Sequence, residues 1–191
     1  MPWAGARSGS PEVQAYYTSK RLAQEVARVV RRYAGPYAEL GVGSGMLYNE
    51  LPEGRQGVEV RRLTPALPGV RYGMDALRWR PKGKVGVVVM NPPFSRQIEF
   101  FNHASTFTDI IVWIAGLNIR LWTNEAELDS MMHLEREWLV PPEWSSFKTE
   151  SGDVQIRTVV QVWRRKRTPR DLWRLCTVSY THLTLPTNRE V

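Results

Sequence analysis

The chain has 191 residues, of which 42% are hydrophobic and 24% charged, as expected for one globular domain with a substantial core. Its net charge of +7 favours a polyanionic partner such as nucleic acid. The single cysteine, Cys176, excludes an internal disulfide, and the 3 histidines are not spaced as metal ligands, so we expect no metal centre. Neither a membrane span nor a signal peptide is predicted, which indicates a cytoplasmic protein.

The N-terminal part of the chain predicts a disordered segment followed by an amphipathic helix. Residues 1–11 are rich in Gly, Ser and Pro, and we expect them to be disordered. Between residues 19 and 33, apolar side chains recur at helical spacing and basic side chains fill many of the positions between them. We expect this helix to end at Gly35 and Pro36, because neither residue continues a helix readily.

The rest of the chain alternates between expected strands and helices. Residues 37–40 predict a short strand that runs into a glycine cluster at 41–45, and helices are expected over 45–51 and 124–133. Further segments have the composition of strands, and they span 56–60, 70–72, 85–90, 109–115, 138–140 and 154–163. The alternation predicts an α/β fold with a mostly parallel sheet and an antiparallel edge strand.

The glycine cluster in YAELGVGSGM has glycines at alternate positions: Gly41, Gly43 and Gly45. Glycines allow the backbone to turn tightly and to approach a ligand closely. The dinucleotide-binding pattern G-x-G-x-x-G does not fit in either register, because Met46 and Tyr48 occupy the third glycine position. The cluster instead resembles the acidic-x-G-x-G-x-G turn of methyltransferases that depend on S-adenosylmethionine, in which Glu39 is the acidic residue.

Two carboxylates follow the next two expected strands. Glu59 ends the second strand in GVEV, and Asp75 follows the third in GMD. In open α/β sheets, ligands bind in the crevice at the carboxyl ends of the strands. At those positions Glu59 can accept hydrogen bonds from ribose hydroxyls, and Asp75 can accept one from an adenine amino group.

The expected strand at 85–90 runs into Asn91-Pro92-Pro93-Phe94. The prolines fix the backbone and have no N–H, so they present carbonyl oxygens as acceptors. The Asn91 side chain adds a further carbonyl, and the Phe94 ring offers a face on which a planar base can stack. Two acceptors facing an exocyclic amino group can draw its nitrogen toward a nucleophilic form, so this segment predicts a site for an amine substrate.

These motifs resemble those of amino-methyltransferases that use S-adenosylmethionine (SAM), chiefly the N6-adenine DNA methyltransferases. YYTSKRLAQEVA at 16–27 is similar to the N-terminal cofactor motif of that family, and it precedes the glycine turn and NPPF as in the gamma arrangement. NPPFSRQIEFFNHAS and DVQIRTVVQVW also resemble phage and bacterial methyltransferases. The resemblance covers roughly residues 12–166 and implies a Rossmann-like class I methyltransferase fold.

The resemblance also implies roles for particular residues and a DNA partner. SAM would be held by Tyr17, Thr18, Glu39, Gly41, Gly43, Glu59 and Asp75. The target amine would be held by Asn91, Pro92, Pro93 and Phe94. Duplex DNA would have to flip out its base. Basic residues either contact phosphates or form a solvated face, namely Arg61, Arg62, Arg78, Arg80, Lys82 and Lys84. The basic cluster at 163–170 could also contact phosphates, although a frayed basic end is the favoured interpretation.

Alternative functions stay open at this point. Glutamine methyltransferases acting on release factors and guanine methyltransferases acting on ribosomal RNA have closely similar N-P-P-aromatic motifs. A non-catalytic binding module with the same fold would keep the sheet and lose affinity for SAM. Labelling of DNA, RNA and protein separates the first two from a DNA enzyme, and titration with SAM tests the third.

The C-terminal part of the sequence differs in composition from the rest. We expect the catalytic domain to span residues 12–168 and a tail to span 169–191. The segment TVSYTHLTLPTNREV at 177–191 resembles a conceptual translation of a transposase-type sequencing adapter, and the match from Thr177 to Thr187 has no mismatch. We therefore expect this segment to be foreign to the natural gene and to contribute nothing to folding or function.

Overall fold

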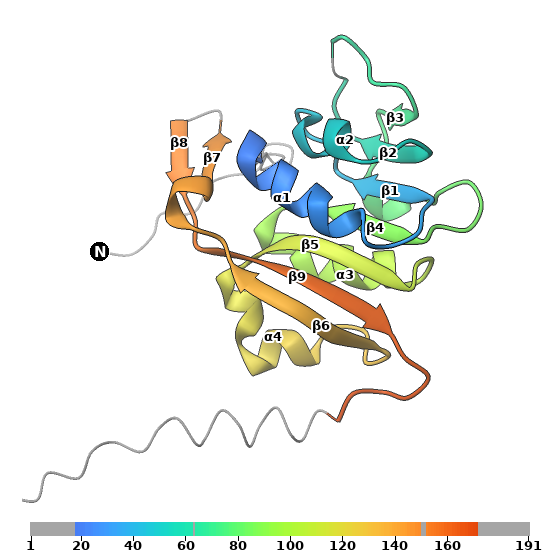
Figure 1. The fold of residues 1–191 in the computed structure, drawn as a ribbon, viewed down its shortest axis with the longest axis vertical. Helices are drawn as coiled ribbons and strands as arrows, with labels where there is room; N and C mark the ends of the chain where they lie inside the picture. Colours follow the sequence, from blue (N-terminus) through green and yellow to red (C-terminus); the bar gives the residue numbers. More distant parts are fainter. Residues whose placement is uncertain (1–17, 63, 150–151, 172–191) are drawn as a thin grey trace, which may run out of the picture.

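The computed structural model describes residues 18–62, 64–149 and 152–171, and its centre is a seven-stranded sheet (Figure 1). The strand order is β3-β2-β1-β4-β5-β9-β6. The strands β1 to β5 pair in parallel, and β9 pairs antiparallel with both β5 and β6. The bounds are β1 Tyr37–Leu40, β2 Arg55–Glu59, β3 Val70–Tyr72, β4 Val87–Met90, β5 Ile110–Gly116, β6 Met132–Leu139 and β9 Thr158–Arg165.

Helices cover both faces of the sheet, and a hairpin follows β6. The α-helices are α1 Lys20–Val30, α2 Met46–Glu50, α3 Gln97–Ser105 and α4 Trp122–Ala126. Short 3-10 helices are η1 Ala76–Arg78, η2 Phe94–Arg96, η3 Leu117–Arg120 and η4 Pro142–Trp144. The hairpin consists of β7 Ser146–Thr149 and β8 Gly152–Gln155, which pair antiparallel outside the main sheet (Figure 1).

The buried strands divide their side chains between two hydrophobic clusters. In β4, Val87 and Val89 pack with α1 and α2, whereas Val88 and Met90 pack with α3 and η1. The alternation follows from the strand geometry, in which successive side chains point to opposite faces. A strand covered on both faces has no polar positions, which is why β4 is a continuous apolar run.

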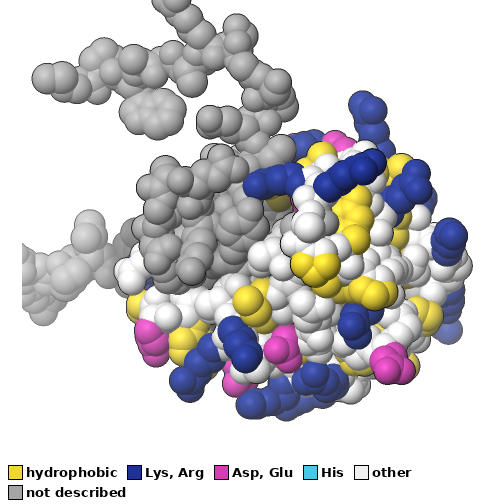
Figure 2. All heavy atoms as spheres, turned by 90° about the horizontal axis from the view of Figure 1, so that it is seen from above, with side chains coloured by type: hydrophobic (Ala, Val, Ile, Leu, Met, Phe, Trp, Pro, Cys, Tyr) yellow, Lys and Arg dark blue, Asp and Glu magenta, His cyan; other side chains and the backbone are white. Residues whose placement is uncertain are grey.

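The helix α1 begins where its N-cap dictates. The Ser19 hydroxyl accepts a hydrogen bond from the Leu22 amide and donates one to the Trp144 carbonyl. This cap satisfies an amide that has no partner within the helix, and it also fastens the helix start to η4. Lys20, Arg21 and Arg28 lie exposed on α1, and Figure 2 shows Lys and Arg side chains spread over the molecule seen from above.

Buried polar side chains between β5 and β9 satisfy one another. The Gln161 side-chain oxygen accepts from the indole nitrogens of Trp113 and Trp163, at 3.0 and 2.9 Å. The Gln161 amide nitrogen donates to Glu137 at 2.6 Å. Two tryptophans can therefore be buried here without an unpaired N–H.

The structure corrects several sequence-based expectations. The expected helix over 124–133 is wrong beyond Ala126, because the Asp129 side chain accepts from the Met131 amide and turns the chain into β6. The expected strand over 154–163 is two strands, β8 and β9, separated by Ile156 and Arg157. The helix α3 was not predicted, and β6 is longer than the expected strand at 138–140.

The remaining predicted strands and helices agree with the structure to within a few residues. Residues 1–11, Tyr17 and residues 177–191 lie outside the described residues, so the expectations for them stay predictions. Arg170, which belongs to the predicted tail, contacts the domain through Glu125, the Leu128 carbonyl and the Trp163 ring. No helix in the described ranges is long and apolar enough to cross a membrane.

Candidate active site

The candidate site lies where the strand order of the sheet reverses. From β1 the chain proceeds outward to β2 and β3 on one side, and then to β4 and β5 on the other. Leu40, the last residue of β1, pairs with Met90, the last residue of β4. The glycine turn and the NPPF segment therefore leave the sheet side by side, at the point where open α/β sheets bind ligands.

The glycine turn needs glycine for two different reasons. Gly41, Gly43 and Gly45 all have positive φ angles, of 77°, 57° and 82°. A Cβ on Gly45 would lie 2.5 Å from the Leu67 side chain, so Gly45 is required for packing. A Cβ on Gly41 would meet nothing within 4 Å, so Gly41 faces open space. This space is available to a ligand that approaches the backbone closely.

Glu39 is a carboxylate buried without a full set of partners. It lies on β1 with 2% of its surface exposed, and its Oε2 atom has no hydrogen-bond partner within the described residues. Burial raises its pKa well above the usual value, and the nearby charge of Glu59 raises it further. Such a group is costly unless a cation or a donor approaches it, so its position suits a positively charged ligand group.

Glu59 supports the glycine turn from the neighbouring strand. Its Oε2 accepts from the Gly43 amide at 2.7 Å, and its Oε1 accepts from the Arg61 amide at 3.0 Å. Each carboxylate oxygen has two acceptor sites, so these contacts leave capacity for ligand hydroxyls. The carboxylate thus holds the turn in shape at the end of β2, where sequence analysis placed it.

Asp75 lies between β3 and η1, at the carboxyl edge of the sheet. It is half-buried after β3, and its Oδ1 accepts from the Leu77 amide at 2.9 Å, which caps η1. Its negative charge is also near enough to contribute to the raised pKa of Arg96, although Glu99 is the main cause. Asp75 and the NPPF segment thus follow strands that end at the same edge of the sheet.

Asn91 contacts the segment that precedes α1. Its Nδ2 donates to the Thr18 hydroxyl at 3.0 Å, although the two residues are 73 positions apart. Both line a small cavity of about 20 Å³. The other residues that line it are Glu39, Gly41, Val42, Gly43, Ser44, Met46 and Leu47. The contact fixes the orientation of the amide, and it brings the start of α1 to the site.

The residues after Asn91 are held by the neighbouring strand. Pro92 is buried, and the Pro93 carbonyl accepts from the Arg96 amide at 2.9 Å to start η2. The Phe94 ring lies against Gly116, because a Cβ there would meet its Cδ1 at 3.6 Å. The ring therefore lies between the ends of β4 and β5.

Gln97 is a supporting residue that sequence analysis missed. It is buried, its Oε1 accepts from the Gly116 amide at 2.9 Å, and its Nε2 donates to Asn118 at 3.0 Å. These bonds fasten the start of α3 to the end of β5, directly beside Phe94. Its signal in the sequence is weak, since a glutamine shortly after NPPF is indistinguishable from a surface residue until the fold is known.

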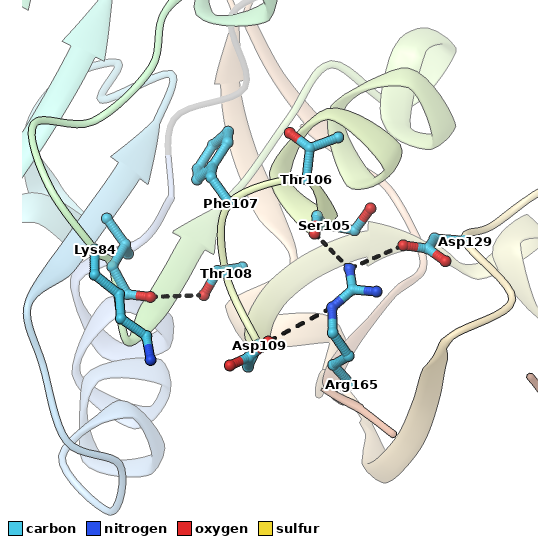
Figure 3. A pocket seen from close by; sticks show the side chains of 9 residues that line it. Lys84, Ser105, Thr106, Phe107, Thr108, Asp109, Asp129 and Arg165 are labelled. Atoms are coloured by element: carbon cyan, nitrogen blue, oxygen red, sulfur yellow. Dashed lines mark hydrogen bonds and ion pairs between the residues drawn. The ribbon is translucent and has the colours of Figure 1, made fainter. Parts of the chain in front are cut away.

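A larger pocket of about 410 Å³ lies at the opposite, amino edge of the sheet (Figure 3). Three of its charged groups are paired, because Arg165 contacts Asp129 at 3.0 Å and Asp109 at 3.5 Å and also donates to the Ser105 carbonyl. These bonds join β9, the start of β5, the end of α3 and the turn before β6. The pocket is thus a structural junction, away from the glycine turn.

The expected phosphate-binding residues are divided between the two edges. Arg61 and Arg62 follow β2 at the carboxyl edge. By contrast, Lys84 lines the amino-edge pocket, Lys82 bonds through its backbone to Gln56 near the start of β2, and Arg80 lies over the Phe107 ring. Across the described part of the chain, no group of three or more potential ligands is placed to hold a metal ion.

Several solved structures with a similar fold are described as methyltransferases. A candidate RNA methyltransferase from Pyrococcus horikoshii has a TM-score of 0.65 and 16% identity, covering 87% of this chain and 92% of its own. The 23S rRNA methyltransferase ErmE has a TM-score of 0.56 and 14% identity, covering 87% and 79%. A ribosomal protein L11 methylase from Lactobacillus delbrueckii has a TM-score of 0.56 and 11% identity, covering 80% and 82%.

The fold is therefore the Rossmann-like fold of class I methyltransferases, which confirms the predicted fold class. No protein-family model and no curated protein matched the sequence.

Proposed function

We propose that the protein is a SAM-dependent methyltransferase that modifies an exocyclic amino group, and that the group is N6 of adenine in DNA. The observation that carries the proposal is the pairing of Leu40 with Met90, which brings the glycine turn beside Asn91-Pro92-Pro93-Phe94. A cofactor turn and an amine-binding segment would then share one crevice. The class I fold supports the same cofactor.

The residues present fit SAM. The buried Oε2 of Glu39 has no hydrogen-bond partner among the described residues, and it would accept a hydrogen bond from the cationic amino group of the cofactor. The open space at Gly41 would admit its close approach. Glu59 would accept from the ribose hydroxyls, and Asp75 would contact the adenine amino group. When bound, SAM would supply the methyl group as an electrophile.

Asn91 and Pro92 would prepare the target amine. Their carbonyl oxygens would accept the two amine hydrogens and draw the nitrogen lone pair out of conjugation with the ring. Thr18 would keep the Asn91 amide in the orientation this requires, because it binds the amide nitrogen. Phe94, held against Gly116, would stack on the base. As the new N–C bond forms and the S–C bond breaks, the nitrogen would release one proton to water.

RNA is the second candidate substrate. Two of the structures that share the fold are described as RNA methyltransferases, one of them acting on 23S rRNA. An adenine amino group presents the same chemistry in RNA, and single-stranded regions would require no base flipping.

Labelling with methyl-tritiated SAM tests the proposal. The protein is incubated separately with unmethylated DNA, ribosomal RNA and cell protein, and the labelled product is digested and identified by chromatography. Label recovered as N6-methyladenine from DNA supports the proposal, and label in RNA favours the second candidate. Label confined to protein would refute both. Calorimetric binding of SAM without any transfer would indicate a non-catalytic module.

A further inference from the structure

Exposed basic side chains lie on both sides of the candidate site at the carboxyl edge of the sheet. Lys20 opens α1, close to the contact between Thr18 and Asn91. Arg62 follows β2, and Arg157 directly precedes β9. All three cations are exposed, and within the described residues none of them forms an ion pair.

Arg157 is placed beside the amine-binding segment by the sheet. Its carbonyl accepts from the Leu117 amide at 2.9 Å, and the adjacent Thr158 pairs with Gly116. Gly116 is the residue against which the Phe94 ring lies. The Arg157 side chain therefore starts from a backbone position next to the proposed target site.

An exposed aromatic side chain lies on the same side. Leu121 and Trp122 follow η3 and are 58% and 47% exposed, although such large apolar side chains are usually buried. The segment is fixed, because the Asn124 side chain donates to the Asn118 carbonyl and Asn118 binds Gln97. Trp122 thus stands on a segment tied to the start of α3, beside Phe94.

Acidic side chains at this edge are already neutralised in part. Glu99 pairs with Arg96 at 2.9 Å, and Glu137 pairs with Arg120 at 3.1 Å. The carboxylates of Glu59 and Asp75 lie in the crevice itself, whereas exposed cations without ion pairs among the described residues surround it, and such cations attract a polyanion to the rim of the site.

We propose that Lys20, Arg62, Arg157 and Trp122 form a nucleic-acid-binding rim. The proposal rests on the proposed function and specifies how its substrate lies. A strand of nucleic acid crosses the carboxyl edge at right angles to the β-strands, with the target base over β4. Lys20, Arg62 and Arg157 contact phosphates, and Trp122 stacks on a neighbouring base.

The spacing of the sheet suits this path. β2 and β9 each lie two strand positions from β4, on opposite sides. With neighbouring strands about 4.8 Å apart, each distance is about 10 Å, which a strand of a few nucleotides can span. Arg62 and Arg157 can therefore contact phosphates on either side of one target nucleotide.

Two triple variants with the same loss of charge test the rim. One is Lys20→Gln/Arg62→Gln/Arg157→Gln at the carboxyl edge, and its control is Lys82→Gln/Lys84→Gln/Arg167→Gln at the amino edge. Binding of a fluorescent single-stranded 12-mer is measured by anisotropy over a salt series. We expect the rim variant to bind at least about tenfold more weakly, with a salt slope smaller by ~2, and the control to change less than about twofold. Equal losses in the two variants would overturn the proposal.

Trp122 is tested with two substitutions. Trp122→Ala should weaken binding of the same 12-mer by at least about fivefold, and Trp122→Phe should restore most of it, because a ring is sufficient for stacking. An unchanged affinity in Trp122→Ala would remove this residue from the rim. Calorimetric titration with SAM should give the same affinity for every variant, since none of these side chains belongs to the cofactor site.

The rim and the proposed function fail in different measurements. Methyl transfer by the unaltered protein decides the function, whereas the comparison of the two triple variants decides the rim. If DNA or RNA is methylated and the two triple variants bind alike, the rim alone is wrong. If no nucleic acid is methylated but the carboxyl-edge variant alone loses binding, the rim is supported and the catalytic proposal is wrong.

Discussion

At the scale of single residues, a substitution of Asn91 is the most direct test of the proposed chemistry. Asn91→Ala removes an acceptor for the target amine, so we expect kcat to fall about 10²-fold or more while the affinity for SAM changes little. Turnover is measured with labelled SAM, and SAM affinity by calorimetry. A variant that methylates at a near-normal rate would refute the assignment.

Thr18→Val provides the comparison for Asn91. It removes the hydroxyl that binds the Asn91 amide nitrogen but leaves the proposed acceptor in place. We expect a smaller fall in kcat than in Asn91→Ala, because the amide can still adopt the required orientation some of the time. An equal fall in both would show that Thr18 contributes more than orientation.

Glu39 is a second single residue, and we expect it to affect both the stability of the protein and its affinity for SAM. Its folded-state pKa is raised by burial and by Glu59, so the folded protein holds a proton that the unfolded chain releases. Stability should therefore decrease as pH rises above about 4.3, the ordinary value for glutamate, toward the raised pKa. Glu39→Gln removes this penalty, and we expect it to raise the Tm without SAM at neutral pH, with a difference that disappears in acid.

The same substitution should weaken SAM binding. A neutral amide loses the charge that would accept the cofactor's amino group, which is worth about 1.5–3 kcal/mol for a charged hydrogen bond. Thermal melts from pH 4 to 8 and calorimetry with SAM measure the two effects. A Glu39→Gln protein that is less stable at neutral pH, or that binds SAM as well as before, would contradict this account.

At the scale of elements, the contribution of the glycine turn to SAM binding can be separated from the strain that a side chain causes at any positive φ angle. Gly41 and Gly54 both have φ of 77°, and a Cβ on either would meet nothing within 4 Å. Alanine at each should therefore cost a similar amount of stability, about 1–2 kcal/mol. Only Gly41→Ala should also weaken SAM binding, because Gly54 lies in the turn before β2, away from the site.

Two further substitutions test the same turn. Gly43→Val adds a branched side chain at positive φ, and Glu59→Ala removes the carboxylate that accepts from the Gly43 amide. We expect each to weaken SAM binding by at least about 1–2 kcal/mol in calorimetry. Unchanged affinity in both would place the cofactor elsewhere.

The sequence predicted the elements that carry a strong local pattern. β4 and β5 are continuous apolar runs, and α1 has a clear apolar face with a Ser19 cap, so these were found. The start of β6 was assigned to a helix, and Leu128 and Met132, which the structure buries, do have helical spacing. The turn between them depends on Asn102 of α3, whose side-chain oxygen accepts a hydrogen bond from the Asp129 amide. No local sequence pattern shows such a contact.

In the candidate site, too, local motifs were found from the sequence and contacts between distant residues were not. The strand ends that carry Glu39, Glu59 and Asn91 were predicted, because short motifs mark them. The supporting contacts were not predicted, since Gln97 binds β5 through the fold alone. Likewise, the sequence could not show that Lys84 lies at the edge opposite Arg62.

At the scale of the whole molecule, the segment at 177–191 is expected to be dispensable. The prediction rests on its match to a translated sequencing adapter. Deletion of residues 177–191 should leave the Tm and the affinity for SAM unchanged, as measured by thermal melts and calorimetry. A clear loss of either in the shortened protein would refute the interpretation of this segment as foreign.

The position of β9 has a consequence for biosynthesis. It is the last strand of the main sheet to emerge from the ribosome, yet it lies between β5 and β6. Until Thr158–Arg165 emerges, the nascent chain carries the complete glycine turn and NPPF, but β5 has an open edge and β6 has no neighbour in the sheet. Chains that terminate before Thr158 would therefore expose the apolar Ile110–Gly116 strand and be prone to aggregate, whatever motifs they retain.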